Sequence, residues 1–253
     1  MKFLKLILDF YINTSIHVAV AVFSLVQITK LQLNISTNLS LDYFIFFGTI
    51  FGYNFLKYFQ VFFNRIFTFK KNSGIFFISL ISFFGMIFYF FRLSSNIEIE
   101  FLKIGLLILI YPFIRKYGFL KMIFVSFCLT LITVYTVNLG NLVYWFYLIQ
   151  RFLIIFCLLI PLEICDLEID SRTIITLPSI IGIQNLKNLG YCLLSLFSFL
   201  IIRFSFCHSI NIVIAIVSAI AIFLSNEKRS KYFTNFWVES LPVFWSIFIF
   251  YTK

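Results

Sequence analysis

The feature that most constrains this chain is a succession of apolar runs, each close to the roughly 20 residues that a helix needs to cross a bilayer. Because lipid offers no hydrogen bonds, a spanning segment must satisfy its own backbone, as a helix does. The sequence therefore predicts an all-α polytopic membrane helix bundle of about nine transmembrane helices, built as a single domain over residues 1–253. The predicted spans are approximately 10–28, 43–63, 74–91, 101–114, 122–137, 142–162, 189–206, 210–224 and 233–251.

Composition agrees with a membrane protein. Hydrophobic residues make up 62% of the chain and charged residues 12%, whereas soluble domains carry about a quarter charged residues. The five cysteines form no C-x-x-C pair and lie mostly within apolar runs, so we interpret them as buried side chains rather than metal ligands or disulfides. No cleavable signal peptide is recognised in residues 1–10, and we expect the first apolar run to remain as a span.

The basic residues predict an orientation, since cytoplasmic loops collect Lys and Arg. They are concentrated before the first predicted span and after the second, fourth, sixth and eighth, while the alternate loops hold few. This asymmetry places the N-terminus in the cytoplasm and Lys253 outside. It also explains the net charge of +10 without a nucleic-acid partner. We expect an integral protein surrounded by membrane lipids, in a bacterial cytoplasmic (inner) membrane.

Acidic residues are scarce and concentrated at one point. Of the ten in the chain, four fall within eight positions at the end of the sixth apolar run: Glu163, Asp166, Glu168 and Asp170. If the run continues as a helix, Glu163, Asp166 and Asp170 share one face. Their mutual repulsion then requires a cation, a proton or solvent at that face.

Polar residues inside the other spans are expected to face the bundle interior. Asn54 and Lys57 lie in the cytoplasmic half of the second span, at the level of the acidic cluster, and we expect them to line one cavity with it. His17 is expected to hydrogen-bond between helices, and Arg203 to reach the outer interface. Arg151 and Glu239 also lie within predicted spans.

A loop containing Pro178 and Gly182 follows the cluster, and Arg172 and Lys187 place positive charge beside the carboxylates. This combination suits a phosphate that a divalent cation bridges to the acids. The alternative is an acidic helix end and a basic loop that only solvate the exit of the span.

The order Asp166-x-x-x-Asp170, then Thr176-Leu177-Pro178 and Gly182, resembles the second signature of the UbiA superfamily of intramembrane prenyltransferases. That family has nine transmembrane helices and two aspartate motifs, which follow the second and sixth helices on the cytoplasmic side. The resemblance implies an isoprenoid diphosphate and a lipophilic acceptor as substrates, with Mg²⁺ as cofactor. By the same resemblance, Asp166 and Asp170 would be the catalytic metal ligands, with Glu163 one turn earlier, and Arg172 and Lys187 would contact the phosphates. We predict Asn54 and Lys57 as the remaining substrate contacts.

The second span departs from the family's first signature, which reads N-D-x-x-D with a further aspartate four positions on. Asn54 fits, but the aspartate positions hold Phe55, Tyr58 and Phe62. Two interpretations stay open: Lys57 replaces a metal ion as a fixed charge in a weakened enzyme, or the chain is an inactive lipid-binding or partner protein. A small secondary transporter is a third alternative, although its coupling acids would be expected near the midplane.

Overall fold

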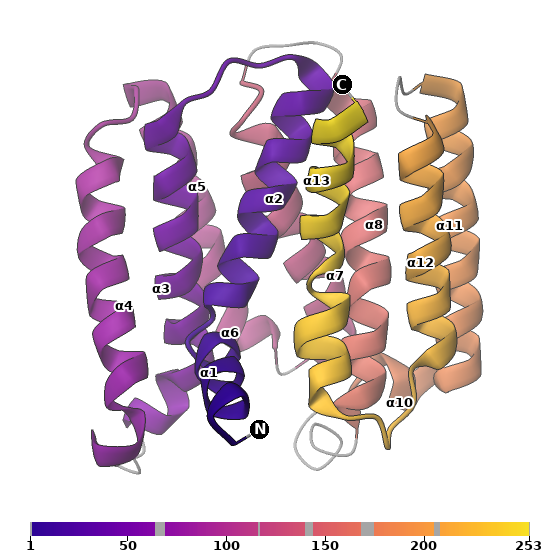
Figure 1. The fold of residues 1–253 in the computed structure, drawn as a ribbon, viewed down its shortest axis with the longest axis horizontal. Coiled ribbons are helices and arrows are strands. Elements are labelled where there is room, and N and C mark those ends of the chain that lie inside the picture. Colours follow the sequence, from indigo (N-terminus) through magenta and orange to yellow (C-terminus); the bar gives the residue numbers. More distant parts are fainter. Residues whose placement is uncertain are drawn as a thin grey trace.

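The computed structural model describes residues 2–63, 69–115, 117–139, 144–167, 175–204 and 208–252, and every regular element in these ranges is helical (Figure 1). The long helices lie side by side with nearly parallel axes, and successive ones run in opposite directions. The α-helices are α1 (Lys2–Asn13), α2 (Ile16–Leu33), α3 (Leu39–Phe63), α4 (Phe69–Phe90), α5 (Ser95–Leu109), α6 (Tyr111–Ile114), α7 (Gly118–Thr130), α8 (Tyr144–Cys165), α10 (Leu177–Ile181), α11 (Ile183–Phe204), α12 (His208–Leu224) and α13 (Leu241–Thr252). Two π-helical segments, η1 (Leu131–Tyr135) and η2 (Phe233–Val238), continue α7 and precede α13.

The two ends of the bundle differ. The end that carries the N-terminus, α1, α6 and α10, lower in Figure 1, is called here the α1 end, and the C-terminus lies at the opposite end. A helix occupies each predicted span. Among the described residues, six helical stretches are long and apolar enough to cross a membrane, and two shorter apolar helices accompany them. The prediction of an all-helical integral membrane protein is therefore confirmed.

The first predicted span has different boundaries, because the chain breaks at Thr14 and Ser15 before α2 begins at Ile16. Thr14 Oγ1 donates to the carbonyl of Phe10 (2.7 Å), and Ser15 adopts the left-handed conformation at φ 61°. Short polar side chains compete in this way with the helical ladder. The turn separates α1, with its exposed Leu6 and Phe10, from the span itself.

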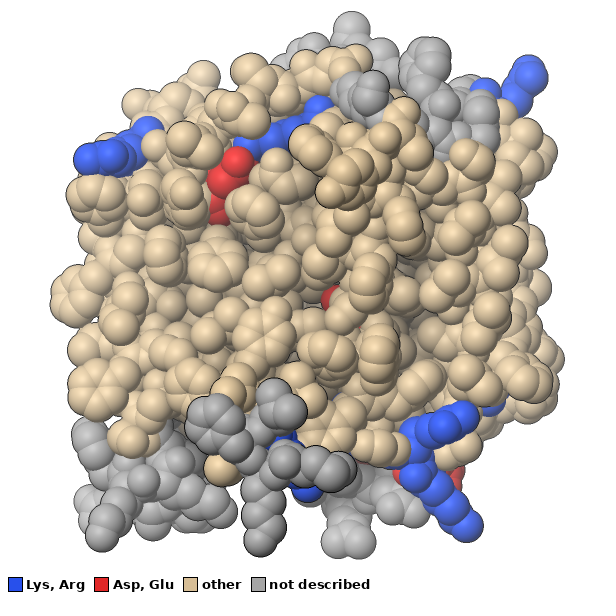
Figure 2. Space-filling view, viewed as in Figure 1, with Lys and Arg blue, Asp and Glu red and all other residues tan. Residues whose placement is uncertain are grey.

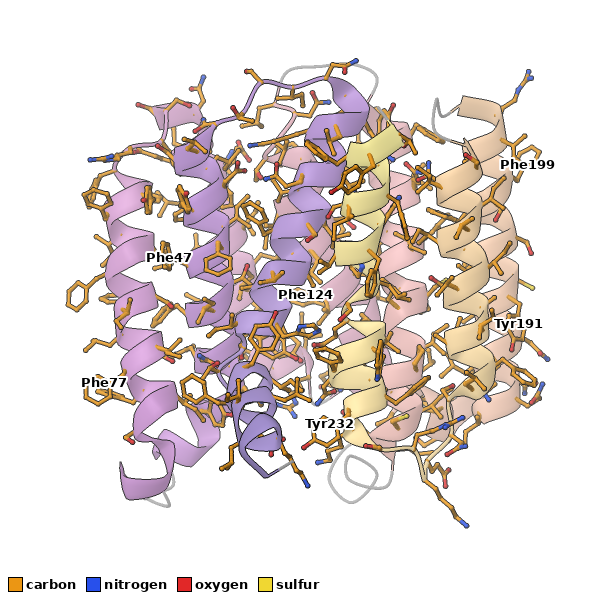
Figure 3. All side chains as sticks on the ribbon, in the orientation of Figure 1. Phe47, Phe77, Phe124, Tyr191, Phe199 and Tyr232 are labelled. Atoms are coloured by element: carbon orange, nitrogen blue, oxygen red, sulfur yellow. The ribbon has the colours of Figure 1, made fainter. Side chains whose placement is uncertain are left out.

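The outer surface of the bundle matches a hydrocarbon environment. Figure 2 shows charged side chains toward the two ends and a nearly uncharged belt between them, in which one acidic group is visible in a hollow near mid-height. Large aromatic side chains point outward from the belt, among them Phe77 and Phe199, which are 59% and 64% exposed (Figure 3). In water such a surface would aggregate, whereas in lipid it is solvated.

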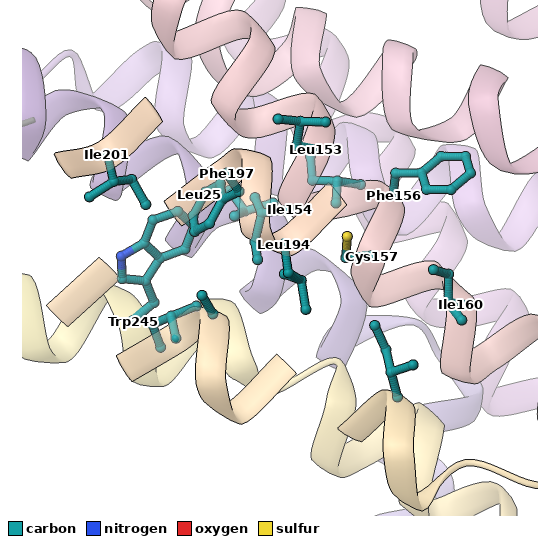
Figure 4. Close-up of a cluster of buried hydrophobic side chains, with 14 of the residues drawn as sticks. Leu25, Leu153, Ile154, Phe156, Cys157, Ile160, Leu194, Phe197, Ile201 and Trp245 are labelled. Atoms are coloured by element: carbon teal, nitrogen blue, oxygen red, sulfur yellow. The ribbon is translucent and has the colours of Figure 1, made fainter. Parts of the chain in front are cut away.

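The core centres on α8, of whose apolar stretch 67% is buried. Its side chains pack against α2, α11 and α13, with Trp245 and Phe197 fully enclosed (Figure 4). Gly190 allows α11 to approach closely, since an added Cβ would lie 2.8 Å from Ile160 and 2.9 Å from Ile222. The structure therefore holds α8, which leads into the acidic cluster, at a fixed position.

Polar contacts link the spans at several depths. Lys30 of α2 and Asp42 of α3 form a buried ion pair at 2.6 Å. Arg151 of α8 is 3% exposed, donates to Thr29 Oγ1 (3.1 Å) and lies 5.0 Å from the ring centroid of Trp245. His17 makes the expected interhelical contact, donating to the carbonyl of Phe236 in η2 (3.0 Å). Arg203 is exposed.

Candidate functional site

The predicted site residue Lys57 lies on α3 one turn after Tyr53, so both project from the same face of the helix. Tyr53 is densely surrounded by protein, yet 41% of its surface is exposed. Lys57 is likewise exposed and yet desolvated by neighbouring protein. Both side chains are therefore accessible and yet closely surrounded by other protein groups, and this part of the surface is called here a recess.

Carboxyl groups from two other elements reach the same recess. Asp166, at the end of α8, and Glu239, between η2 and α13, both act electrostatically on Lys57 and on Tyr53. Asp166 also acts on Glu239. η2 packs directly on α8, and each acid directly follows one of these two elements. The structure thus gathers Lys57 and two carboxyl groups from three elements that are far apart in sequence, and Lys231 also acts electrostatically on Lys57.

Arg115 is a further cation near this group. It follows α6, the short helix that begins at Tyr111, and both residues act electrostatically on Tyr53. The buried Nε atom of Arg115 has no hydrogen-bond acceptor within the described part of the chain. A guanidinium in this position can bind an anion that enters the recess. We call Tyr53, Lys57, Arg115, Asp166 and Glu239 the charged recess.

Asn54 belongs to a different set of contacts. Its amide donates to the carbonyl of Thr14 and to Ser79 Oγ, both at 3.0 Å, and accepts from Ser15 Oγ at 2.5 Å. These bonds join α3 to α4 and to the turn between α1 and α2, and the side chain is 2% exposed. Asn54 therefore fixes the helix that carries Lys57, and its described hydrogen bonds all go to protein groups.

Glu163, predicted as a metal ligand, is 5% exposed. One of its carboxylate oxygens lies 2.7 Å from Lys121 Nζ on α7. Asp166, three residues on, acts instead on Tyr53 and Lys57. The described residues contain no group of three or more acidic, His or Cys side chains placed to hold a metal. Asp170 lies outside these residues.

Lys187, predicted as a phosphate contact, caps a helix. Its Nζ donates to the carbonyls of Phe223 (2.9 Å) and Ser225 (2.7 Å), at the end of α12. Cations in this position satisfy the carbonyls that a helix C-terminus leaves open. Arg172, the other predicted phosphate contact, falls outside the described residues.

The sequence already contained a signal for two of the residues that its site prediction omitted. Glu239 is an acid inside an apolar run, which marks a functional candidate by itself. Tyr53 precedes Lys57 by four residues, a helical spacing that places the two on one face. Arg115 offered no such signal, because in sequence it is one of several basic residues in a loop.

Comparison with known proteins adds no assignment, because no family model, curated protein or solved structure matches this chain.

Proposed function

We propose that this protein is a UbiA-like membrane prenyltransferase, which transfers an isoprenoid group from a prenyl diphosphate to a lipophilic acceptor. The observation that carries the proposal is that Lys57 on α3 and Asp166 at the end of α8 lie within electrostatic range of one another. Such a recess combines cations for phosphate oxygens with a carboxylate for a divalent cation. Its apolar surroundings suit an isoprenoid tail.

The proposed topology has nine crossings and a cytoplasmic N-terminus, in a bacterial cytoplasmic membrane. The α1 end would then face the cytoplasm, where soluble prenyl diphosphates are available. Basic residues at the α1 end support this orientation. They are Lys121, Lys187, Lys228 and Arg229, which lie in or beside the segments at that end. A reporter fused after Lys253 should be outside, and a cytoplasmic signal would contradict nine crossings.

In the proposed reaction, the bond between the allylic carbon and the diphosphate oxygen breaks, and its electron pair leaves with the diphosphate. A nucleophilic atom of the acceptor supplies the pair that forms the new bond, and the acceptor loses a proton. Lys57 and Arg115 would hold the diphosphate and stabilise its growing charge. The recess would keep water away from the allylic carbon.

Mg²⁺ fits the chemistry of the donors at the end of α8. Asp166 offers carboxylate oxygens, which this ion prefers, and Mg²⁺ commonly binds through one or two carboxylates together with substrate phosphates. Asp166 and Asp170 would hold it. When bound, the ion would neutralise phosphate charge. Glu163 is engaged by Lys121 and would join the set only if that pair opened.

The alternative is an inactive lipid-binding or partner protein of the same fold. It is favoured by α3, where Phe55, Tyr58 and Phe62 stand at the family's aspartate positions. In addition, Tyr58 donates to the carbonyl of Asn13 (3.0 Å), so this position serves the packing of α1. Binding of a prenyl diphosphate without any product would identify this alternative.

The test is thermal unfolding of the purified protein with Mg²⁺ and farnesyl or geranylgeranyl diphosphate. At 100 times its Kd a ligand stabilises the folded state by about 2.7 kcal/mol, which raises the Tm by several degrees. Asp166→Asn and Lys57→Met should each remove most of this rise. The control is Lys103→Met, because Lys103 pairs with Glu100 on α5 and is 63% exposed. No rise in Tm with either diphosphate would refute the proposal. If the Tm rises, an assay with radiolabelled diphosphate and an aromatic acceptor separates turnover from binding alone.

A further inference from the structure

The acids inside the membrane-spanning stretches differ in what they contact. Three occur in the described stretches of this kind: Asp42, Glu163 and Glu239. Asp42 lies 2.6 Å from Lys30, and Glu163 lies 2.7 Å from Lys121. The Glu239 carboxyl forms no hydrogen bond or ion pair with any described residue, although it is within electrostatic range of Lys57. It is half-buried, so a ligand can reach it.

Burying a carboxyl group in hydrocarbon without a partner costs free energy. Such a group therefore marks a candidate ligand-binding site. The local backbone supports this reading. Glu239 ends a π-helical segment, and its own N–H bonds the carbonyl of Thr234, five residues back. Segments of this kind are frequent at functional sites, because the wider turn redirects the side chains that follow.

The ligand of Glu239 differs from that of the two cations. A diphosphate carries several negative charges and would bind at Lys57 and Arg115. A carboxyl group instead suits a partner that donates a hydrogen bond, since its oxygens accept one in either protonation state. Glu239 is half-buried, so part of its side chain stays accessible to such a partner.

We infer that Glu239 binds the acceptor, by accepting a hydrogen bond from its hydroxyl or amino group, so that the acceptor is a lipophilic molecule with an O–H or N–H donor. This inference rests on the proposed function, because it assigns the second substrate of the same recess. Lys57 and Arg115 then face the diphosphate, and Glu239 faces the acceptor.

The experiment compares 1-naphthol with 1-methoxynaphthalene, which lacks the donor, as competitors for a fluorescent naphthol analogue in nanodiscs. The unmodified protein should bind 1-naphthol at least about tenfold more tightly, because a site built to accept a hydrogen bond rejects a ligand that cannot donate one. Glu239→Met should remove this preference and leave the affinity for 1-methoxynaphthalene unchanged. Glu239→Gln, which keeps an amide oxygen as acceptor, should retain part of it. Glu100→Met is the matched control, since Glu100 pairs with Lys103 at the opposite end.

Equal affinity for the two naphthalenes, or a preference that survives Glu239→Met, would overturn the inference. If Glu239→Met does not fold, Glu239→Ala takes its place, and a preference that survives in that variant would overturn the inference as well. The rise in Tm with prenyl diphosphate should persist in Glu239→Met and in Glu239→Gln. A missing shift in the unmodified protein would refute the proposed function, whereas a shift without naphthol selectivity would refute the role of Glu239 alone.

Discussion

Two groups of intramembrane charges lie near opposite ends of α3, and they are built differently. Asp42, in the first turn, meets Lys30 at 2.6 Å, and the two side chains are 5% and 3% exposed. Lys57 lies 15 residues further on, about 22 Å along the helix. It is exposed, and its opposing charges on Asp166 and Glu239 act on it without a direct ion pair.

The difference shows what each arrangement can do. A buried pair in contact satisfies both charges and leaves nothing for a ligand, so it fixes the register of α2 against α3. Lys57 and Glu239 face the recess without a direct ion pair between them, so both keep their capacity to bind. One helix thus carries a charged group that stabilises the fold and another that can bind a ligand. Removing one member of each group tests this difference.

The largest expected effect is on the buried pair. Lys30→Met leaves Asp42 buried without its partner and should destabilise the protein by about 3–5 kcal/mol. Lys57→Met should change stability by less than about 1 kcal/mol, since no direct ion pair is broken. Thermal unfolding in detergent measures both. The double variant Lys30→Met with Asp42→Leu should recover most of the stability, and equal losses for the two lysine variants would remove the distinction.

The second-largest loss of stability is expected from the hydrogen bonds of Asn54. Asn54→Leu removes three hydrogen bonds and leaves the Thr14 carbonyl and two hydroxyls without this partner, so a loss of about 2–4 kcal/mol is expected. Ser79→Ala, which removes one of the three, should cost about 1 kcal/mol. If Asn54 instead served mainly to bind substrate, Asn54→Leu would keep the Tm of the ligand-free protein and lose only the shift with prenyl diphosphate.

Much of the fold was predictable, because hydrocarbon leaves a spanning chain few alternatives to helices. Apolar runs located a helix at each predicted position. The break at Ser15 was not predicted. It depends on hydrogen bonds to Asn54, 39 residues away, and a local pattern cannot show such a partner.

The site was less predictable, because the pairing of side chains depends on how helices are rotated against one another. Glu163 and Asp166 are three residues apart and were expected on one face. In the structure Glu163 pairs with Lys121 on α7, whereas Asp166 acts on Tyr53 of α3 and on Glu239. Similarly, the sequence shows Lys187 as a basic residue near the acids, and only the packing of α11 on α12 shows that it bonds two carbonyls.

Lys187 offers a sharper test of structural against binding charge. Lys187→Met removes two bonds to helix-terminal carbonyls at a half-buried position, so a loss of about 1–2 kcal/mol is expected. The affinity for prenyl diphosphate should change by less than about twofold, since no bond to the recess is lost. Isothermal titration in nanodiscs measures the affinity. A tenfold loss of affinity at unchanged Tm would reassign Lys187 to the phosphate site.

The smallest expected effect lies where α1 meets the segment that leads to Glu239. Tyr232 donates a hydrogen bond to Asp9 of α1 (Figure 3 shows Tyr232 near the α1 end), and this bond raises the pKa of Tyr232. Since the raised pKa favours the protonated phenol in the folded state, the contact is intact below the ordinary tyrosine pKa of about 10 and weakens as pH rises further. Tyr232→Phe should shift the Tm by less than about 2 °C but speed amide hydrogen exchange in α1. η2 follows directly and ends at Glu239. Naphthol binding should nevertheless be unchanged in this variant. A loss of binding would mean that α1 positions the Glu239 carboxyl group rather than only covering the end of the bundle.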